Sequence, residues 1–292
     1  MKIVNVLGGL GNQMFEYAMY LALKDAHPEE EIYLCTRSYN GYPLHNGYEL
    51  KRIFGIEGPE ATLSQLLKVA YPIFNYKTWQ FMHHILPQRK SMALGTENIP
   101  FNFHEVTRND NVFYDGYWQN ENNFISIRDK ILKAFSFSDF EDERNLALAC
   151  TVLKKRAVSC HIRRGDYLKD PIMCVCNTLY YEKAFAKVED LVSPEMYVIF
   201  SDDIQWCRKN ITSFIEDKDI VFVDWNNGVD SYRDMQLMSL CNYNIIANSS
   251  FSWWGGWLNQ HFDKIVISPE KWMNKPIVNS PICKSWIRIS NA

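Results

Sequence analysis

Short apolar runs alternate with amphipathic stretches throughout the second half of the chain. The apolar runs cover residues 157–161, 196–200, 220–223, 243–247 and 264–267, and the amphipathic stretches cover 179–191, 204–209, 229–240 and 251–260. A short apolar run predicts a buried strand, whereas apolar residues three or four positions apart predict a helix. Regular alternation of the two predicts a parallel sheet with helices on both faces.

The first half follows this pattern less closely. Strands are predicted over residues 2–7, 31–36 and 111–119, and helices are predicted after the glycine-rich segment 8–13 and over 62–70, 121–135 and 142–153. Residues 71–86 are rich in aromatic side chains but show neither period clearly. The adjacent His83 and His84 lack the spacing of a helical metal site, so we interpret them as core or surface histidines. We expect an α/β chain with an N-terminal domain over residues 1–155 and a C-terminal domain over 156–292.

The bulk composition is that of a soluble globular protein with two domains of ordinary size. Of the 292 residues, 47% are hydrophobic and 22% are charged. The net charge of −3 provides no basic field that would hold nucleic acid. No apolar run approaches the roughly 20 residues of a membrane span, and the N-terminus does not form a signal peptide. We therefore expect a cytoplasmic protein, or one that has been trimmed of a targeting segment.

The cysteines favour free thiols over disulfides or metal ligands. There are 8, at positions 35, 150, 160, 174, 176, 207, 241 and 283. The even number is compatible with disulfides, but Cys35 and Cys160 lie within apolar runs that predict buried strands. Cys174 and Cys176 lack the spacing and the second pair of a zinc site. We therefore predict free cysteines and no bound metal.

A dense polar cluster follows the first predicted strand of the second half. His161, Arg163 and Arg164 arrive within four residues, and Asp166 closes the cluster after a glycine. Ligands of α/β sheets bind at the carboxyl ends of strands, and a guanidinium presents a rigid fork of donors to carboxylate or phosphate. The cluster therefore indicates an anion site, although a surface turn with a local ion pair explains the same residues.

Two further polar clusters follow predicted strands. Asp202 and Asp203 stand where an acid would bind a ribose hydroxyl or a base edge, or would cap the next helix. The other cluster comprises Ser249, Ser250, Phe251 and Ser252. Hydroxyls beside the unpaired N–H groups of a helix start suit phosphate. Capping is again the alternative, but three serines exceed what one cap needs.

The first half contributes a glycine-rich turn and one polar strand face. Residues 8–13, with Asn12 as the expected helix N-cap, form an anion-cradling turn or simply a tight turn. They match neither the dinucleotide-binding fingerprint nor the P-loop. Asp115, Tyr117 and Gln119 alternate along the last predicted strand of this half and would share one face. That face offers a carboxylate, a phenol and an amide to a polyhydroxyl ligand, or is simply hydrated.

Taken together and in this order, these motifs resemble the α-1,2-fucosyltransferases, glycosyltransferase family 11, and in particular the soluble bacterial type. The matching segments are His-x-Arg-Arg-x-Asp at 161–166, Ser-Asp-Asp at 201–203, Ser-Ser-Phe-Ser-Trp-Trp at 249–254 and Gly-Gly-Leu-Gly-Asn-Gln-Met-Phe at 8–15. The resemblance implies a GT-B-like fold, in which two Rossmann-like domains face a cleft. It also implies transfer of L-fucose from GDP-β-L-fucose to O2 of a terminal β-galactoside, which forms an α-1,2 linkage.

The resemblance assigns a role to each candidate of the donor and catalytic clusters. The donor-binding residues would be His161 and one of Asp202 and Asp203 at the guanosine, Ser249, Ser250, Phe251 and Ser252 at the phosphates, and Asn12 closing over the donor from the first domain. Arg163 would lie at the diphosphate, within a catalytic cluster of Arg163, Arg164 and Asp166. From the residues themselves, and not from the resemblance, we expect Asp115, Tyr117 and Gln119 to bind the acceptor.

The charges in these motifs predict how the leaving group is stabilised. Preorganised positive charge at a developing anion is a large catalytic term, and the two arginines supply it. The adjacent Asp202 and Asp203 lack the Asp-x-Asp spacing that holds a metal in many glycosyltransferases. We therefore expect a metal-independent, inverting, single-displacement transfer that needs no cofactor besides its GDP-fucose donor. Asp166 and Asp115 are both candidates for the general base, but a carboxylate beside two guanidiniums is a poor base and Asp166 would equally well orient Arg164.

Two further interpretations stay open on sequence alone. A catalytically silent protein of the same fold would use its cleft to bind a guanine nucleotide or a glycan without turnover. An acceptor carried on a lipid would bring the chain to a membrane surface as a peripheral protein. The expected partners are GDP-fucose and a β-galactoside glycan, and nucleic acid is not among them.

Overall fold

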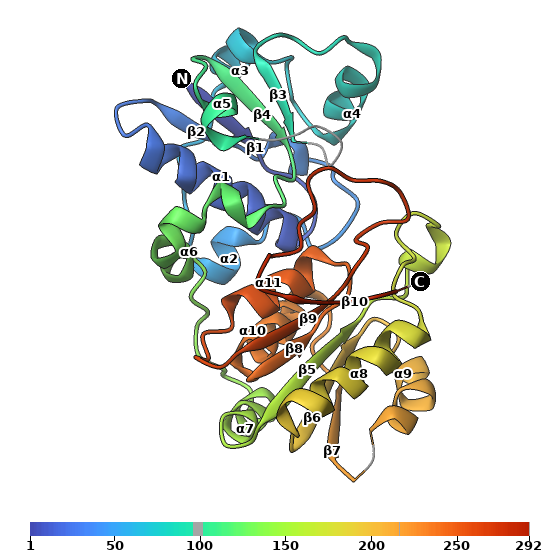
Figure 1. The fold of residues 1–292 in the computed structure, drawn as a ribbon. Coiled ribbons are helices and arrows are strands. Elements are labelled where there is room, and N and C mark those ends of the chain that lie inside the picture. The colour runs from blue at the N-terminus through green and yellow to red at the C-terminus, as the bar shows by residue number, and fades with distance from the viewer. Residues whose placement is uncertain (96–101, 216, 292) are drawn as a thin grey trace. The chain divides into compact units, whose positions relative to one another are not determined.

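The computed structural model of this chain describes residues 1–95, 102–215 and 217–291, and these residues form two units (Figure 1). Unit 1 comprises Met1–Ser138 and Ile277–Pro281, and unit 2 comprises Asp139–Pro276 and Ile282–Ala292. The chain therefore passes between the units at 138/139, again at 276/277 and again at 281/282. Within unit 1, the Asn120 side-chain amide donates to the carbonyl of Ser280 at 3.5 Å, which ties the short returning segment to its unit.

Unit 1 is built on a parallel sheet, which has four strands in the order β2-β1-β4-β3 among the described residues. The strands are β1 (Lys2–Asn5), β2 (Ile32–Cys35), β3 (Met92–Gly95) and β4 (Val112–Gly116). The helices are α1 (Leu10–Ala26), α2 (Leu50–Phe54), α3 (Leu63–Val69), α4 (Tyr76–Ile85), α5 (Phe103–Thr107) and α6 (Arg128–Ala134). Leu66 and Val69 of α3 pack on Ile3 and Phe113, so the amphipathic α3 covers the centre of the sheet.

Unit 2 is built on a larger parallel sheet, with the order β10-β9-β8-β5-β6-β7 in the part of the chain that is described. The strands are β5 (Ala157–Ile162), β6 (Met196–Ser201), β7 (Asp219–Val223), β8 (Tyr243–Ile245), β9 (Ile265–Pro269) and β10 (Ile287–Ile289). The helices are α7 (Glu143–Val152), α8 (Thr178–Val192), α9 (Ile204–Asn210), α10 (Tyr232–Leu240) and α11 (Ser250–Leu258). The expected α/β class with two Rossmann-like units is confirmed, and the cleft between facing domains stays a prediction.

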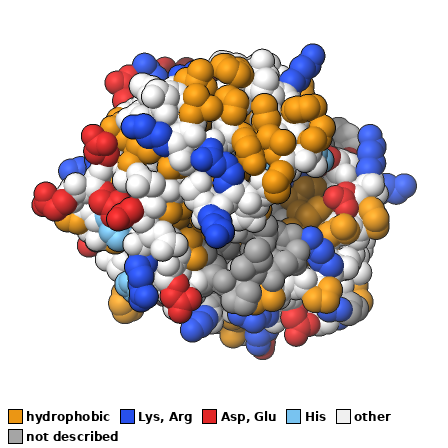
Figure 2. Space-filling view, turned by 90° about the horizontal axis from the view of Figure 1, so that it is seen from above, with side chains coloured by type: hydrophobic (Ala, Val, Ile, Leu, Met, Phe, Trp, Pro, Cys, Tyr) orange, Lys and Arg blue, Asp and Glu red, His pale blue; other side chains and the backbone are white. Residues whose placement is uncertain are grey.

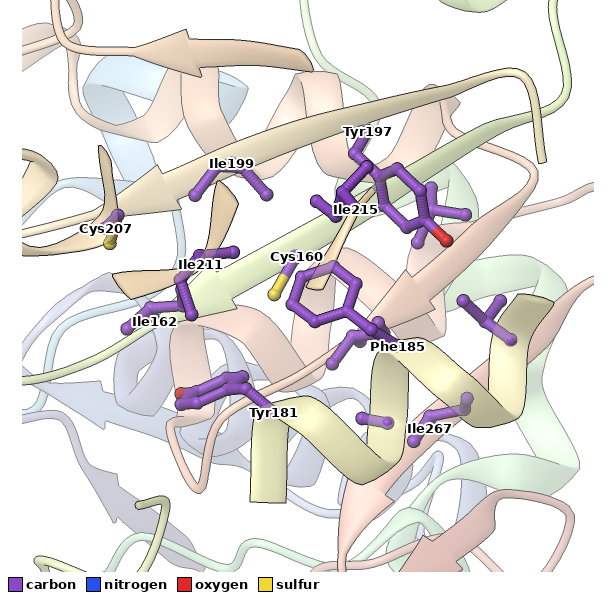
Figure 3. Packing of buried hydrophobic residues seen from close by; sticks show 14 of the residues in the cluster. Cys160, Ile162, Tyr181, Phe185, Tyr197, Ile199, Cys207, Ile211, Ile215 and Ile267 are labelled. Carbon is purple, nitrogen blue, oxygen red and sulfur yellow. The ribbon is translucent and has the colours of Figure 1, made fainter. Parts of the chain in front are cut away.

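The core of unit 2 fixes the central strand β5 on both of its faces. Tyr181 and Phe185 of α8 lie against Cys160 and Ile162 of β5, and all four side chains are buried (Figure 3). On the other face, α7 and α10 pack against the sheet around Ala157. Burial of apolar surface contributes roughly 25 cal/mol per Å², so β5 is a rigid base for the loop that follows it.

In both sheets the order of strand addition reverses beside the first strand of the unit. After β1 the chain places β2 on one side and β4 on the other, and after β5 it places β6 on one side and β8 on the other. Ligands of open α/β sheets bind outside the carboxyl ends of the strands at such a reversal. Each unit therefore has one expected binding position, between β1 and β4 in unit 1 and between β5 and β8 in unit 2.

The division between the units lies earlier than the expected boundary between residues 155 and 156. Helix α7 belongs to unit 2, because its residues Leu148, Ala149 and Val152 pack against Met196 and other residues of the second sheet. A helix that precedes the first strand of a sheet can be assigned to that sheet only once the packing is known. The unit boundary after Ser138 is therefore set by the side-chain contacts of α7, which the order of elements along the sequence does not reveal.

Three elements of unit 1 differ from the sequence prediction. Residues 71–86, which showed no clear period, contain α4. Strand β4 ends at Gly116, short of the expected residue 119, because Gly116 has a φ of 131° and Trp118 a φ of 52°. Residues 121–135 form two short 3₁₀ turns and then α6 instead of one helix.

The described residues settle two smaller expectations. All eight cysteines are free thiols, as predicted. No helix in the described part of the chain is both long enough and apolar enough to cross a membrane.

Candidate active site

Three loops meet at the carboxyl ends of the neighbouring strands β8, β5 and β6 of unit 2. The backbone N–H of Arg164 donates to Oδ1 of Asp202 at 2.9 Å, which joins the loops after β5 and β6. The Tyr167 hydroxyl donates to the carbonyl of Asn248 at 3.3 Å, which joins the loops after β5 and β8. The three polar clusters of the second half of the sequence therefore lie at one edge of one sheet, at its reversal point.

Both arginines of the loop after β5 are held by carboxylates. Arg163 lies 2.7 Å from Oδ1 of Asp166 and 3.0 Å from Oδ2 of Asp202. The Nε of Arg164 donates to Oδ2 of Asp203 at 3.1 Å. Asp166 thus contacts Arg163 rather than Arg164, which it was expected to orient. An anion that approaches Arg163 competes with two carboxylates that are already in place.

Arg164 is also packed from the side. Its guanidinium lies 3.8 Å from the centre of the Trp206 ring, in cation–π contact. Trp206 belongs to α9 and was not among the expected site residues, because a single tryptophan in a short helix gives no sequence signal of its own. Arg164 is thus held both at Nε and on one face of its guanidinium, and Arg163 has a similar ring contact with Tyr167 at 5.4 Å.

The two acids after β6 organise the loops. Asp203 is the N-cap of α9, where its Oδ1 accepts from the backbone N–H of Trp206 at 3.1 Å, so the capping alternative is confirmed for this residue. Asp202 accepts from the backbone of Arg164 and pairs with Arg163. A Cβ at Gly165 would lie 2.7 Å from Oδ2 of Asp202, so this close approach requires glycine. Each acid is engaged on both of its oxygens.

His161 is buried beneath these charges at the end of β5. Burial, with the charge of Arg163 as the second cause, lowers the pKa of His161 to about 3, so the imidazole is neutral at pH 7. The ring centre lies 5.7 Å from that of Phe251, the second residue of α11. Its Nδ1 is buried and has no hydrogen-bond partner among the described residues. A buried polar atom without a partner costs free energy, and native proteins contain few of them.

The start of α11 presents donors at the carboxyl end of β8. Ser249 is the N-cap, and its side chain makes no capping hydrogen bond to the helix. Ser250 is half-buried, whereas Ser252 is buried and its hydroxyl donates to the carbonyls of Ala247 and Ser249, each at 3.2 Å. Ser252 therefore braces the turn from inside. The hydroxyls of Ser249 and Ser250 and the first N–H groups of α11 are the groups suited to an anion.

The loop after β1 has a different form from the expected one. Helix α1 begins at Leu10 with Gly9 as its N-cap, so Asn12 lies in the first turn of the helix and is not the cap. Gly8 has a φ of 94°, which a residue with a Cβ adopts only under strain. The Oδ1 of Asn12 accepts from the side-chain amide of Gln119 at 2.8 Å. The structure thus brings together two residues that were expected on the donor side and on the acceptor side.

Asp115 lies at the reversal point of unit 1 and is buried. Its Oδ1 accepts from the side-chain amide of Asn5 at 2.8 Å. Its Oδ2 accepts from the Trp79 indole at 3.3 Å and lies 3.5 Å from Nδ1 of His83. The hydrogen bond to Asp115 raises the pKa of His83 above its usual value. His83, interpreted from the sequence as a core or surface residue, is therefore paired with a buried carboxylate.

Asp115, Tyr117 and Gln119 do not alternate along one strand, so the prediction of a common strand face is wrong. The alternation ends with β4 at Gly116, whose left-handed backbone turns the chain away. Tyr117 is exposed and Gln119 is half-buried beside Asn12. The mistake arises because a strand period was extended across a glycine that ends the strand.

Helix α4 supplies an aromatic row beside Asp115. The rings of Tyr76 and Trp79 stack with centres 5.8 Å apart, and those of Trp79 and His83 stack 5.2 Å apart. A pocket next to the row has a mostly apolar lining that includes Ile73, Met82, Leu86, Leu94 and Phe113, and His83 and Asp115 also line it. The spacing of Tyr76, Trp79 and His83 places them on one side of a helix, and this is the signal that would have predicted the row.

Neither unit offers a metal site among the residues described. No group of three or more His, Cys, Asp or Glu side chains is placed there to hold an ion. The positive charge at this edge of the unit 2 sheet comes from Arg163 and Arg164, and each donates to carboxylates of the loops after β5 and β6.

Comparison with known proteins gives one family. The family model described as Glycosyl transferase family 11 matches residues 68–290. An α-1,2-colitosyltransferase of Escherichia coli is 31% identical over 301 residues, which cover 98% of this chain and 98% of the relative. The galactoside 2-α-L-fucosyltransferase Sec1 of Mus musculus is 26% identical over 276 residues, which cover 88% of this chain and 64% of the relative. A solved structure of NodZ α-1,6-fucosyltransferase soaked with GDP-fucose has a TM-score of 0.47 and 15% identity, and the match covers 88% of this chain and 91% of that one.

Proposed function

Because this chain belongs to glycosyltransferase family 11, we propose that it transfers L-fucose from GDP-β-L-fucose to O2 of a terminal β-galactoside, with inversion at the sugar carbon. The observation that carries the proposal is the meeting of three loops around Arg163 at the reversal point of unit 2. When the bond between the sugar carbon and the diphosphate breaks, negative charge builds on the leaving GDP. Fixed guanidinium charge and helix N–H groups stabilise that charge.

Each chemical group of the donor has a matching set of side chains at this edge of the unit 2 sheet. Arg163 binds the diphosphate in place of one of its present carboxylate partners, and Ser249 and Ser250 contact the phosphates at the start of α11. The neutral His161 and the ring of Phe251 lie beside the guanosine, where an imidazole both donates and accepts hydrogen bonds. Because side chains and a helix end supply all the positive charge, the transfer needs no metal ion.

The acceptor fits the crevice of unit 1. Stacked aromatic rings at Trp79 and His83 suit the apolar face of a pyranose, and the amide of Gln119 suits its hydroxyls. Both oxygens of Asp115 already accept hydrogen bonds, so it acts best by orienting His83. His83 is then the stronger candidate for the base that removes the proton of the acceptor hydroxyl, since Asp166 is paired with Arg163.

A second donor is favoured by the relative that is 31% identical, whose name is colitosyltransferase. Colitose lacks the 3-hydroxyl of fucose, so the two donors differ by a single hydrogen-bonding group. A site built to bind that hydroxyl rejects the deoxy sugar strongly, whereas an apolar site at that position tolerates both sugars. The ratio of kcat/KM for the two donors therefore reports whether polar or apolar side chains surround the 3-position of the bound sugar.

The test is a linkage analysis of the product. Purified protein is incubated with lactose and either GDP-fucose or GDP-colitose in the presence of EDTA, and the product is examined by NMR. We expect an α-linked deoxysugar on O2 of galactose, and no reaction with a 2-deoxygalactoside. Transfer to another hydroxyl contradicts the proposed linkage, and loss of activity in EDTA contradicts metal independence. Nucleotide binding without turnover on any β-galactoside would instead indicate a silent binding protein.

A further inference from the structure

Helix α4 has a second side that the proposed acceptor site does not use. Tyr76, Trp79 and His83 lie on the side that faces Asp115 and the pocket. Phe81 and Ile85, four residues apart and therefore neighbours on the helix surface, are 56% and 62% exposed. No residue of α4 is fully buried, and only Trp79 among its described residues packs against the unit 1 core cluster, so the helix carries apolar groups on both sides.

The apolar surface continues onto the neighbouring segment. Leu67 of α3 is 49% exposed, and Phe74, just before α4, is 50% exposed. We name Leu67, Phe74, Phe81 and Ile85 the α3–α4 face. Figure 2 views the molecule from the end at which α3 and α4 lie in Figure 1, and it shows hydrophobic side chains gathered there with Lys and Arg side chains beside them. Grouped exposed apolar residues of this kind mark interaction surfaces.

The stretch of sequence that carries this face has charged residues of one sign. Between Glu60 and Glu97 the sequence contains no Asp or Glu and contains four basic residues, Lys68, Lys77, Arg89 and Lys90. The chain as a whole is acidic, with 34 acidic and 31 basic residues. The guanidinium of Arg89 is engaged with the carbonyls of Leu67 and Ala70 at the end of α3, whereas the three lysines are exposed. The face therefore suits an anionic partner.

We propose that the α3–α4 face docks on an anionic lipid bilayer. Apolar side chains that enter the headgroup region and lysines that approach lipid phosphates are the two contributions that hold a peripheral helix on a membrane. Protein interfaces, by contrast, are poor in lysine at their centres. Docking does not depend on which sugar is transferred, and it would hold the other side of α4 near an acceptor that is carried on a lipid.

The first experiment is co-sedimentation with lipid vesicles. The full chain is mixed with vesicles of phosphatidylcholine alone and with vesicles that also contain phosphatidylglycerol. We expect the protein to sediment with the anionic vesicles and not with the neutral ones, and we expect added salt to release part of it because screening weakens attraction to the charged surface. Equal binding to both vesicle types, or binding to neither, overturns the proposal.

Matched variants locate the surface. The double variant Phe81→Ser with Ile85→Ser removes apolar area, and Lys77→Glu reverses a charge on the same side of α4. Each is expected to weaken vesicle binding by at least about fivefold. The control is Phe262→Ser, since Phe262 is a fully exposed aromatic residue of unit 2 and is expected to have no effect. All variants should keep the wild-type turnover on free lactose and the wild-type thermal shift with GDP.

The outcomes separate docking from catalysis. An equal loss of vesicle binding in the Phe262 control, or no loss in the Phe81 and Ile85 variant, overturns the proposed surface. The wild type could instead form a concentration-dependent dimer and fail to bind vesicles. If the Phe81 and Ile85 variant abolishes that dimer, the face is a contact between two copies of the chain, and the proposal is overturned. Vesicle binding without turnover on lactose rejects only the proposed function, and turnover without vesicle binding rejects only the docking.

Discussion

Two arginines and three carboxylates share the edge of the unit 2 sheet, so the cluster has a formal charge of 2 − 3 = −1. If the cluster binds a diphosphate as we propose, we expect one carboxylate to move away from Arg163. Asp202 and Asp203 also accept from backbone N–H groups, which holds them in place. Asp166 makes one ion pair and its side chain is 63% exposed, so it is the carboxylate that yields.

Asp166→Asn is expected to strengthen GDP binding by about three- to tenfold, because it removes the charge that competes for Arg163. Turnover should stay within about tenfold of the wild type, since Asp166 is not the base in our proposal. Calorimetry of GDP binding and steady-state kinetics measure the two quantities. Unchanged GDP affinity with a loss of turnover above about 10³-fold would instead make Asp166 the general base.

Arg163→Ala is expected to lower kcat/KM by at least about 10²-fold, because a preorganised donor to the leaving group is lost. Arg163→Lys should recover only part of this loss, because an ammonium lacks the planar fork. Arg156→Ala is the control, since Arg156 is an exposed arginine that pairs with Glu195 at the other end of β5. If the alanine variant at 163 loses tenfold or less, the diphosphate is held elsewhere.

The buried imidazole of His161 is expected to stay neutral between pH 8 and pH 5, because burial lowers its pKa to about 3. The folded value lies below the unfolded value of about 6.5, so this group's contribution to stability is present above pH 6.5 and is lost as the pH falls toward 3. Histidine NMR titrations of the wild type and of His161→Gln identify the signal. His83 should titrate above pH 6.5 in the same spectra, and a midpoint near 6.5 for His161 contradicts its burial.

Strand β5 and helix α4 differ in how far the sequence predicts them. Every residue of β5 is buried, so its apolar run is a sufficient signal, and the polar residues after it were correctly expected at a sheet edge. Helix α4 buries none of its residues and carries apolar groups on both sides, so its period is masked. The pairing of Asp115 with His83 was equally hidden, because it joins a strand end to a helix that had not been recognised.

Gly116 shows how one backbone conformation sets the end of β4. A Cβ at this position would lie 2.4 Å from the carbonyl oxygen of Gly95 on the neighbouring strand, at a φ of 131°. Gly116→Ala is therefore expected to lower the free energy of unfolding by about 2–4 kcal/mol. Gly41→Ala is the control, since Gly41 also has a positive φ but nothing lies within 4 Å of its added Cβ, and a loss of about 1 kcal/mol is expected there. Urea unfolding measures both, and equal losses would show that the contact with Gly95 is unimportant.

The described residues form two sheets, each with its own reversal point, so the two ligands are expected to bind to separate units. In a hydrogen-exchange experiment, GDP should protect the backbone of residues 161–167, 201–206 and 248–252 and leave α4 unchanged. A β-galactoside should protect residues 76–85 and 115–119 instead. Protection of α4 by GDP alone would mean that the nucleotide binds to unit 1 or that the units are coupled.

The short return of Ile277–Pro281 to unit 1 matters for anyone who recombines this protein with its relatives. A chimera made by a single crossover near residue 138 would receive a new first unit but would keep five residues of the old one, from 277 to 281, which include the Ser280 carbonyl that Asn120 contacts. Exchange of acceptor preference between family members therefore calls for three junctions, at 138/139, 276/277 and 281/282. Chimeras with a single junction would combine residues of two family members within unit 1. An inactive chimera of this kind would not show which residues determine acceptor specificity.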